Sequence, residues 1–371
     1  MADKLTGVSL FAGAGGMDVG FEQAGIEVIF ANELVKTFAD TYCANHDPSV
    51  MHVGDVSGII DTIGNLKGAD LVFGGAPCQG FSQAGKMDPD DPRSQLIWRF
   101  LDIVERVEPR AFVMENVKAL GQMRRWEGVR AKYMQRASDM GYACHRFILN
   151  ATDYGVPQKR ERVFFVGVRG AGDFEDLMWE ILESHKEKAP TVREALSDLG
   201  KAGTAENPST CPAKITFAKN PIMRSTPYAG MYFNGAGRPV DVDHYANTVP
   251  ASMGGNRTPI IDEDYLYGSM GFDWVAGYHR DLQGGMSPRS GEAPKWLRRI
   301  TIREVMRLQT FPDDYELCGS VTSQYRQLGN AVPVKLAKAV GASVIELLDR
   351  LDAGDASSPA DGASADASAD E

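Results

Sequence analysis

The chain contains 371 residues, of which 43% are hydrophobic, and it carries a formal net charge of −11. It has no apolar run of about eighteen residues, the length that spans a membrane, and its first residues lack the apolar segment of a secretory signal. The five cysteines include no Cys-x-x-Cys pair and the six histidines are scattered, which argues against a disulfide framework and a metal site and predicts a cytoplasmic protein.

Strand-like and helix-like patterns alternate through the first half of the chain. Short apolar runs predict strands at residues 8–11, 26–31, about 70–75, 111–116, 145–149 and 163–168. The segments between them predict helices at residues 16–23, 34–44 and 95–107. Alternation of this kind indicates a doubly wound, parallel α/β sheet.

The pattern changes after about residue 186. Residues 230–291 contain eleven glycines and no sustained helical period, which indicates a smaller, loop-rich domain. Helical spacing returns at residues 302–309 and again from 332 to 351. We therefore predict a large domain over residues 1–185 and 311–351, interrupted by a smaller one over 186–310.

The negative charge is unevenly distributed. Six acidic residues and no basic one follow Arg350, in a stretch of Ala, Ser, Asp and Gly that predicts a disordered acidic tail over residues 352–371. Residues 186–310 hold sixteen Lys and Arg against thirteen Asp and Glu. Because the local field decides the choice of partner, the total charge does not exclude nucleic acid.

A glycine-rich motif, Phe11-Ala12-Gly13-Ala14-Gly15-Gly16, connects the first strand with the first helix. Glycines there let the backbone approach a ligand, and the helix N-terminus offers free N–H groups. Its spacing differs from the dinucleotide fingerprint. Two acidic residues follow at strand ends, Glu33 and Asp55. The carboxylate of Glu33 suits a ribose diol, and that of Asp55 could accept a hydrogen bond from an adenine amino group. An adenosine-type cofactor site is expected, with a purely structural turn as the alternative.

Reactive side chains recur at the ends of later strands. Cys78 follows Pro77 behind an apolar run, and Glu115 closes another strand in the same predicted crevice. A thiolate is a strong nucleophile, and a desolvated carboxyl can act as an acid near neutral pH. Arg160 and Arg162 precede a further strand, and we expect their side chains to point to opposite faces. Each of these signals has a structural alternative when taken singly. Cys78 could be a buried thiol, Glu115 a solvated carboxylate, and the two arginines part of a charged edge.

Together these motifs resemble the cytosine-C5 DNA methyltransferases. The ordered set Phe-x-Gly-x-Gly-Gly, Pro-Cys-Gln, Glu-Asn-Val and Gln-x-Arg-x-Arg continues with Arg-Ile-Thr-Ile-Arg-Glu, Gln-Thr-Phe-Pro-Asp and Gly-Asn-Ala-Val-Pro. The resemblance covers residues from about 6 to 350. It implies a doubly wound, Rossmann-like, S-adenosylmethionine-dependent methyltransferase domain, with a target-recognition domain at 186–310 inserted before the C-terminal helix.

The resemblance also implies a mechanism. Cys78 would attack cytosine C6, Glu115 would hold or protonate N3, Arg162 would reach O2 and Arg160 would lie nearer the backbone phosphate. The target base would be flipped out of double-stranded DNA, and residues 79–93 would form a closing loop. The base that removes the C5 proton is left open, with a water as one option.

Cofactor and DNA contacts follow from the same resemblance. S-adenosylmethionine would be bound by Phe11, Ala12, Gly13, Gly15, Gly16, Glu33, Asp55, Val56, Pro77, Asn330 and Ala331. Leu34 departs from the aromatic residue that many relatives place against the adenine, so weaker stacking is expected. DNA would be contacted by Gln79, Ser82, Arg93, Arg224, Arg238, Asn256, Arg257, Arg298 and Arg299. A monomer is expected, serving a restriction-modification system whose endonuclease acts at the same DNA site; a solitary or phage-borne enzyme would have the same sequence features.

Three other functions share part of this pattern. A nicotinamide or flavin oxidoreductase would also carry a glycine loop, but it does not explain Pro-Cys-Gln together with Glu-Asn-Val. A non-catalytic DNA-binding homologue is disfavoured because the nucleophile, the acid and both arginines are present. A tRNA cytosine-C5 methyltransferase stays open, although the long insertion bearing Arg and Asn favours duplex DNA.

Overall fold

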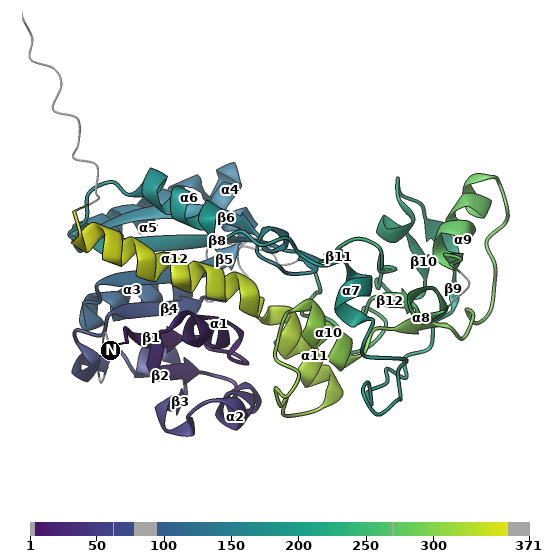
Figure 1. Ribbon diagram of the computed structural model, residues 1–371, viewed down its shortest axis with the longest axis horizontal. Coiled ribbons are helices and arrows are strands. Elements are labelled where there is room, and N and C mark those ends of the chain that lie inside the picture. Colours follow the sequence, from purple (N-terminus) through teal and green to yellow (C-terminus); the bar gives the residue numbers. More distant parts are fainter. Residues whose placement is uncertain (1–3, 62, 78–94, 269–270, 355–371) are drawn as a thin grey trace, which may run out of the picture.

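The central element of the computed structural model is a seven-stranded sheet with the order β3-β2-β1-β4-β5-β8-β6 (Figure 1). The structure describes residues 4–61, 63–77, 95–268 and 271–354. The strands of the sheet are β1 (Thr6–Leu10), β2 (Glu27–Glu33), β3 (Met51–Val53), β4 (Leu71–Gly75), β5 (Ala111–Val117), β6 (Tyr142–Asn150) and β8 (Glu161–Arg169). The α/β fold is confirmed.

One strand corrects the prediction of a parallel sheet. Strands β1 to β5 pair in parallel, but β8 lies antiparallel to both β5 and β6. The link from β6 to β8 contains only a short 3-10 turn (Ala151–Asp153) and β7 (Gln158–Lys159). A parallel pair needs a crossover of about a dozen residues or more, usually with a helix, so this short link returns the chain in the opposite direction.

Helices cover both faces of the sheet, as the doubly wound prediction requires. One face packs against α1 (Gly16–Ala24), α6 (Glu175–Ser184) and α12 (Val334–Asp352). The other face packs against α3 (Leu96–Val107), α4 (Lys118–Gln122) and α5 (Glu127–Asp139). Neighbouring strand residues divide between the two cores, as Phe112 and Val113 do, because side chains alternate along a strand. Helix α2 (Lys36–Asn45) lies beside β2 and β3.

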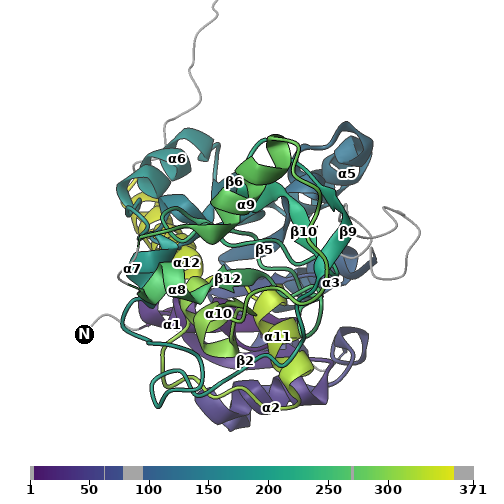
Figure 2. The same ribbon diagram turned by 90° about the vertical axis from the view of Figure 1, so that its right-hand side faces the viewer.

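The loop-rich segment forms a second body, which lies to the right of the sheet in Figure 1 and in front of it in Figure 2. Its elements are α7 (Val192–Leu196), β9 (Phe217–Ile222), β10 (Met231–Phe233), β11 (Ala246–Asn247), β12 (Ile260–Asp262), α8 (Glu263–Tyr267), α9 (Trp274–Gln283) and β13 (Leu297–Arg299). Its outer part has an apolar core of its own, built around Tyr232, Phe233 and Tyr278.

The base of this body shares its core with the C-terminal segment. Helices α10 (Ile302–Leu308) and α11 (Val321–Asn330) pack against each other, and one apolar cluster joins Val249 and Ile300 to Tyr325 and Val334. The domain limits at 185/186 and 310/311 stay a prediction.

The end of the chain requires a small correction. Helix α12 continues through Asp352, whose carboxylate pairs with Arg110 at 2.6 Å, so the predicted tail does not begin at residue 352. Residues 355–371 lie outside the described part. Within the described part, no helix has the length and apolar character to cross a membrane.

Candidate active site

The glycine motif forms a tight loop between β1 and α1. Phe11, Gly13 and Gly15 adopt positive φ angles of 56°, 59° and 79°. This region is open to glycine and strained for phenylalanine, and such strain is typical of functional loops. The loop is held from β2, because the Glu33 carboxylate accepts hydrogen bonds from the N–H of Gly13 at 2.9 Å and of Val35 at 2.8 Å.

Burial raises the pKa of the Glu33 carboxyl, while the N–H groups of Val35 and Gly13 oppose that rise. The N–H of Leu34 also acts on this carboxylate and opposes the rise of its pKa. A carboxylate has about four acceptor positions, so Glu33 keeps the capacity to accept a hydroxyl of a ribose.

The C-terminal motif packs directly on this loop. A Cβ atom on Gly16 would lie 2.8 Å from the carbonyl oxygen of Val332 and 3.1 Å from the side chain of Ala331. Only glycine allows this approach. The structure therefore brings Ala331, and Asn330 at the end of α11, beside a loop more than three hundred residues earlier in the chain.

The second predicted acid lies on a loop that Asn32 holds in place. The buried Asn32 amide donates to the carbonyls of His52 and Gly54, both at 3.0 Å. Asp55 follows, exposed, and its carboxylate caps a short turn by accepting from the N–H of Ser57 at 2.7 Å; the next side chain, Val56, is buried.

Two large apolar side chains are exposed beside the acids: Leu34 is 63% exposed and Val53 is 49% exposed. Exposed apolar side chains next to Glu33 and Asp55 offer packing surface for a heterocyclic ring. These residues and the glycine loop fit the adenosine part of the expected cofactor.

The strand-end carboxyl and one arginine meet at the same edge of the sheet. The Arg162 Nε lies 2.8 Å from Glu115 Oε1, and both side chains are largely buried. Burial raises the pKa of the Glu115 carboxyl, opposed first by the charge of Arg162 and then by that of Arg160. Gly75, at the end of β4, pairs with Glu115, and a Cβ there would lie 3.1 Å from Glu115 Oε2.

Asn116 is a further positioning residue whose role the sequence did not reveal. Its buried amide donates to the carbonyl oxygen of Ala76 at 3.1 Å, and its own oxygen accepts from the N–H of Val117. Asn116 thus ties the end of β5 to the segment that leads into Pro77, which is half-buried. Cys78 itself lies outside the described residues, as do Gln79, Ser82 and Arg93.

Arg160 corrects an expectation. Its side chain is only 1% exposed. It donates to the carbonyl oxygens of Val249 at 3.4 Å, Gly329 at 3.1 Å and Asn330 at 3.4 Å. A guanidinium held inside the protein does not reach a DNA phosphate, so the predicted phosphate contact is wrong for this structure. Arg160 precedes β8 and Arg162 lies in it, so the expectation that they point to opposite faces stays a prediction; the two side chains have different hydrogen-bond partners, and the charges of both act on the Glu115 carboxyl.

Arg160 belongs to a buried junction between the two bodies. Gln158 donates to the Gln309 side chain at 2.8 Å and accepts from the N–H of Val249 at 3.0 Å. The Thr248 hydroxyl donates to the carbonyl of Lys159 at 2.5 Å, and β11 pairs with β7 over the same residues. The motif Gln-x-Arg-x-Arg therefore has two structural roles. Arg162 pairs with Glu115 at the end of β5, whereas Gln158 and Arg160 connect the two bodies.

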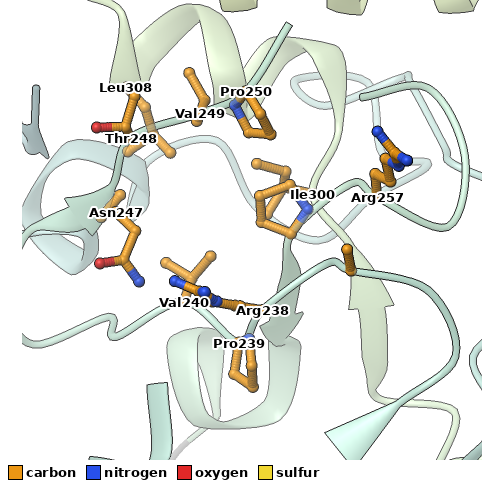
Figure 3. Close-up of a pocket in the computed structure, with 13 residues that line it drawn as sticks. Arg238, Pro239, Val240, Asn247, Thr248, Val249, Pro250, Arg257, Ile300 and Leu308 are labelled. Carbon is orange, nitrogen blue, oxygen red and sulfur yellow. The ribbon is translucent and has the colours of Figure 1, made fainter. Parts of the chain in front are cut away.

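Two predicted DNA-contacting arginines, Arg238 and Arg257, line a pocket in the second body beside this junction (Figure 3). The pocket has a volume of about 220 Å³, and Asn247, Val249 and Pro250 also line it. Arg238 and Arg257 are exposed, and so are the predicted contacts Arg224 and Asn256. Exposed cations and amides around a pocket are suited to phosphate and base edges.

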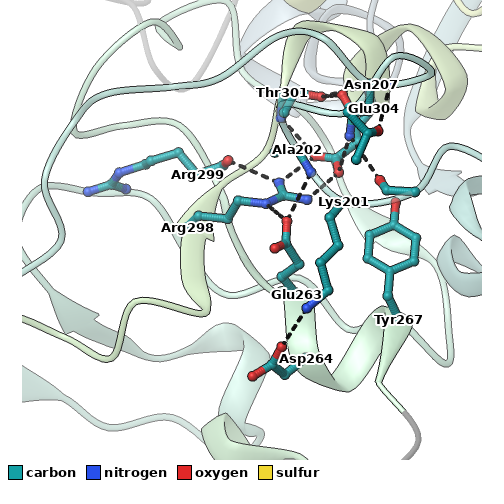
Figure 4. Close-up of polar contacts among 12 residues, drawn as sticks. Lys201, Ala202, Asn207, Glu263, Asp264, Tyr267, Arg298, Arg299, Thr301 and Glu304 are labelled. Carbon is teal, nitrogen blue, oxygen red and sulfur yellow. Dashed lines mark hydrogen bonds and ion pairs between the residues drawn. The ribbon is translucent and has the colours of Figure 1, made fainter.

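Arg298 and Arg299 lie inside the protein instead. Arg298 forms ion pairs with Glu263 and with Glu304, whose side chain is fully buried (Figure 4). Arg299 is 0% exposed and donates to the carbonyls of Thr258 at 2.7 Å and Asn234 at 3.1 Å. The expectation of DNA contacts for these two arginines is therefore wrong, because Arg298 is paired with two carboxylates and Arg299 is buried and bonded to backbone carbonyls.

Comparisons with known proteins agree with this site. The family model for the C-5 cytosine-specific DNA methylase matches residues 5–346. The Type II methyltransferase M1.HphI of Haemophilus parahaemolyticus is 32% identical, over 93% of this chain and 87% of its own length. The Type II methyltransferase M.FnuDI of Fusobacterium nucleatum is also 32% identical, over 92% of this chain and 94% of its own length.

Solved structures support the fold. The Dnmt2 methyltransferase of S. pombe superposes with a TM-score of 0.64 at 18% identity, covering 94% of this chain and 100% of the other. The methyltransferase EhMeth of Entamoeba histolytica gives 0.66 at 17% identity, covering 94% and 99%. The family model spans nearly the whole chain and both curated relatives exceed 30% identity. The chain therefore belongs to the C-5 cytosine-specific DNA methylases and is a DNA (cytosine-5-)-methyltransferase.

Proposed function

We propose that this methyltransferase modifies a flipped-out cytosine within a specific sequence of double-stranded DNA, through a covalent bond between Cys78 and C6. The observation that carries the proposal is the Glu115–Arg162 pair. It joins a desolvated carboxyl to a guanidinium at the end of β5, beside the strand that leads to Cys78 three residues later.

The proposed chemistry uses this pair at the ring. The Cys78 thiolate forms a bond to C6, and the electron density released toward N3 is met by Glu115, which holds or donates a proton there. Arg162 donates to O2 and offsets the remaining negative charge. After methyl transfer, loss of the C5 proton and release of the thiolate restore the double bond. The raised pKa of Glu115 supports this role, because a carboxyl that stays protonated closer to neutral pH can donate.

The family uses S-adenosylmethionine, which supplies an electrophilic methyl group when bound. We place its binding at the loop Phe11–Gly16 (contacts from Phe11, Ala12, Gly13, Gly15 and Gly16), at Glu33 and at the loop of Asp55 and Val56, with Pro77, Asn330 and Ala331 closing the pocket. Supporting observations are the positive φ angles of the loop, the buried Glu33 carboxylate and the contact between Gly16 and Ala331. Glu33 would accept from the ribose and Asp55 from the adenine amino group.

DNA binding is assigned to the surface around the pocket of Arg238 and Arg257. Arg224 and Asn256 are exposed on the same body and complete the described part of the proposed surface. Gln79, Ser82 and Arg93 are kept as DNA contacts from the sequence alone. A role in restriction-modification beside a companion endonuclease, a monomeric state and a cytoplasmic location are parts of the same proposal.

Radiolabelled methyl transfer tests the proposal. The wild-type enzyme, labelled S-adenosylmethionine, genomic DNA and tRNA are combined, and bisulfite sequencing then locates the modified cytosines. We expect label in DNA at one short recognition sequence. Cys78→Ser should abolish transfer while the dissociation constant for S-adenosylmethionine stays near the wild-type value. Label in tRNA alone, or an equal loss of transfer and cofactor binding in the variant, would contradict the proposal.

A further inference from the structure

A second layer of polar side chains lies behind the glycine loop, on the side away from Glu33. Tyr315, from the segment between α10 and α11, donates its hydroxyl to the carbonyl oxygen of Ala14 at 2.5 Å. The same hydroxyl oxygen lies 3.1 Å from Nε2 of His46. A Cβ on Gly15 would lie 2.6 Å from both of these atoms. His46 and Tyr315 therefore contact the cofactor loop itself.

His46 is held on its other side by a carboxylate. Its Nδ1 lies 3.0 and 3.1 Å from the two oxygens of Glu22, which belongs to α1. Its ring stacks on Tyr42 at 4.2 Å between centroids, and its side chain is only 2% exposed. The imidazole thus links the helix that follows the loop to the tyrosine that holds the loop.

Hydrogen-bond donors and acceptors define the protonation state that fits this geometry. Tyr315 has one hydroxyl proton, and the carbonyl of Ala14 can only accept, so that proton points at Ala14. The Tyr315 oxygen must then accept from an Nε2–H. A carboxylate also only accepts, so Glu22 requires an Nδ1–H. Both ring nitrogens carry protons, and His46 is an imidazolium in this arrangement.

Several titratable groups surround His46. The titratable groups that face it are Glu22 and Asp18 from α1, Tyr42 from α2 and Tyr315. Asp18 is fully buried, and burial raises its pKa to about 6, with the charge of His46 opposing the rise.

We propose that His46 and Tyr315 are positioning residues for the cofactor loop, and that loss of a proton from His46 weakens S-adenosylmethionine binding. A neutral ring has one N–H and cannot satisfy both Glu22 and the Tyr315 oxygen. If the proton stays toward Glu22, the Tyr315 hydroxyl turns to Nε2 and leaves the Ala14 carbonyl. Affinity for the cofactor then falls as the pH rises. The inference rests on the proposed cofactor site.

Equilibrium binding of S-adenosylmethionine without DNA tests the inference, measured from about pH 6 to about pH 9, a range that spans histidine titration in proteins. Tyr315→Phe removes one hydroxyl and keeps the ring. Its matched control is Tyr325→Phe, because Tyr325 makes an equivalent bond to the carbonyl of Ile300 at 2.6 Å, away from the loop. His46→Phe keeps a ring against Tyr42 and cannot titrate.

At low pH we expect Tyr315→Phe to weaken binding about fivefold, the effect of one lost hydrogen bond, with kcat at saturating cofactor near the wild-type value. The ratio between Tyr315→Phe and wild type should shrink toward one as the pH rises, since the wild-type loop contact is then lost as well. In His46→Phe the Tyr315 hydroxyl has no competing acceptor and stays on the Ala14 carbonyl, so binding by this variant should lack the decline with rising pH. Tyr325→Phe should match wild type throughout. If titration of Asp18 changes cofactor affinity, it does so equally in Tyr315→Phe and in wild type. This effect therefore cancels in the ratio of their two affinities.

A Tyr315→Phe variant that binds like wild type at every pH, or a ratio that stays constant with pH, would overturn the inference while leaving the cofactor site in place. An absence of S-adenosylmethionine binding by the wild-type protein would instead overturn the proposed cofactor site, and this inference with it.

Discussion

Replacing Arg160 separates its structural role in the described junction from the phosphate contact that the sequence resemblance implies. Arg160→Met keeps an unbranched apolar stem but leaves the carbonyls of Val249, Gly329 and Asn330 without this donor. At ~1 kcal/mol for each net hydrogen bond, the variant should lose about 3 kcal/mol of unfolding free energy, measured by urea denaturation. Because Asn330 also belongs to the proposed cofactor pocket, the KM for S-adenosylmethionine should rise.

The salt dependence of DNA binding gives the decisive readout. Each phosphate contact adds about 0.9 to the slope of log affinity against log salt concentration, so loss of a contact reduces the slope by that amount. We expect an unchanged slope for Arg160→Met and a reduced slope for Arg257→Ala, whose side chain is exposed beside the pocket. A slope reduced by about 0.9 in Arg160→Met, with wild-type unfolding free energy, would refute the structural role.

Three further changes test other parts of the site. Glu115→Gln should lower kcat by about 10² to 10⁴-fold and keep cofactor affinity. Burial raises the pKa of Glu115, so the wild-type rate should decline as rising pH removes its proton, and the variant should lack this decline; an identical pH profile would contradict the acid role. Glu33→Gln should raise the KM for S-adenosylmethionine about tenfold, because an amide nitrogen cannot accept from the N–H of Gly13; an unchanged KM would argue against Glu33 as a ligand. Glu304→Gln should cost about 1.5–3 kcal/mol of unfolding free energy, since Arg298 keeps its pair with Glu263 but loses its fully buried second carboxylate, and a wild-type denaturation midpoint would contradict this.

The sequence allowed prediction of the elements whose pattern is local. Apolar runs identified β4 and β5, and a helical period identified α3 and α12 close to their observed ends. The direction of a strand cannot be predicted from its own residues. The antiparallel orientation of β8 follows from the link to β6, which is too short to contain the helix of a parallel crossover.

The roles of the arginines show the same limit. Arg298 and Arg299 follow each other in a segment with a basic excess, which is typical of a DNA-binding surface. Their partners Glu263, Thr258 and Asn234 are distant in sequence, and pairing across such distances leaves no local pattern. Glu115 and Arg162 could be predicted to lie near each other because both flank strand ends, but the ion pair between them was not predictable.

The junction between the two bodies has a consequence for how specificity can change. Arg160 and Gln158 hold Val249 through its carbonyl and its N–H, atoms that every residue except proline carries. These two bonds therefore do not depend on the side chain of Val249, whereas Thr248 adds a bond from its hydroxyl. If the surface beside this junction reads DNA as proposed, substitutions at Asn247 or Arg257 would alter what it reads while the catalytic edge keeps its alignment. An enzyme built in this way would be able to acquire a new target sequence by point mutation.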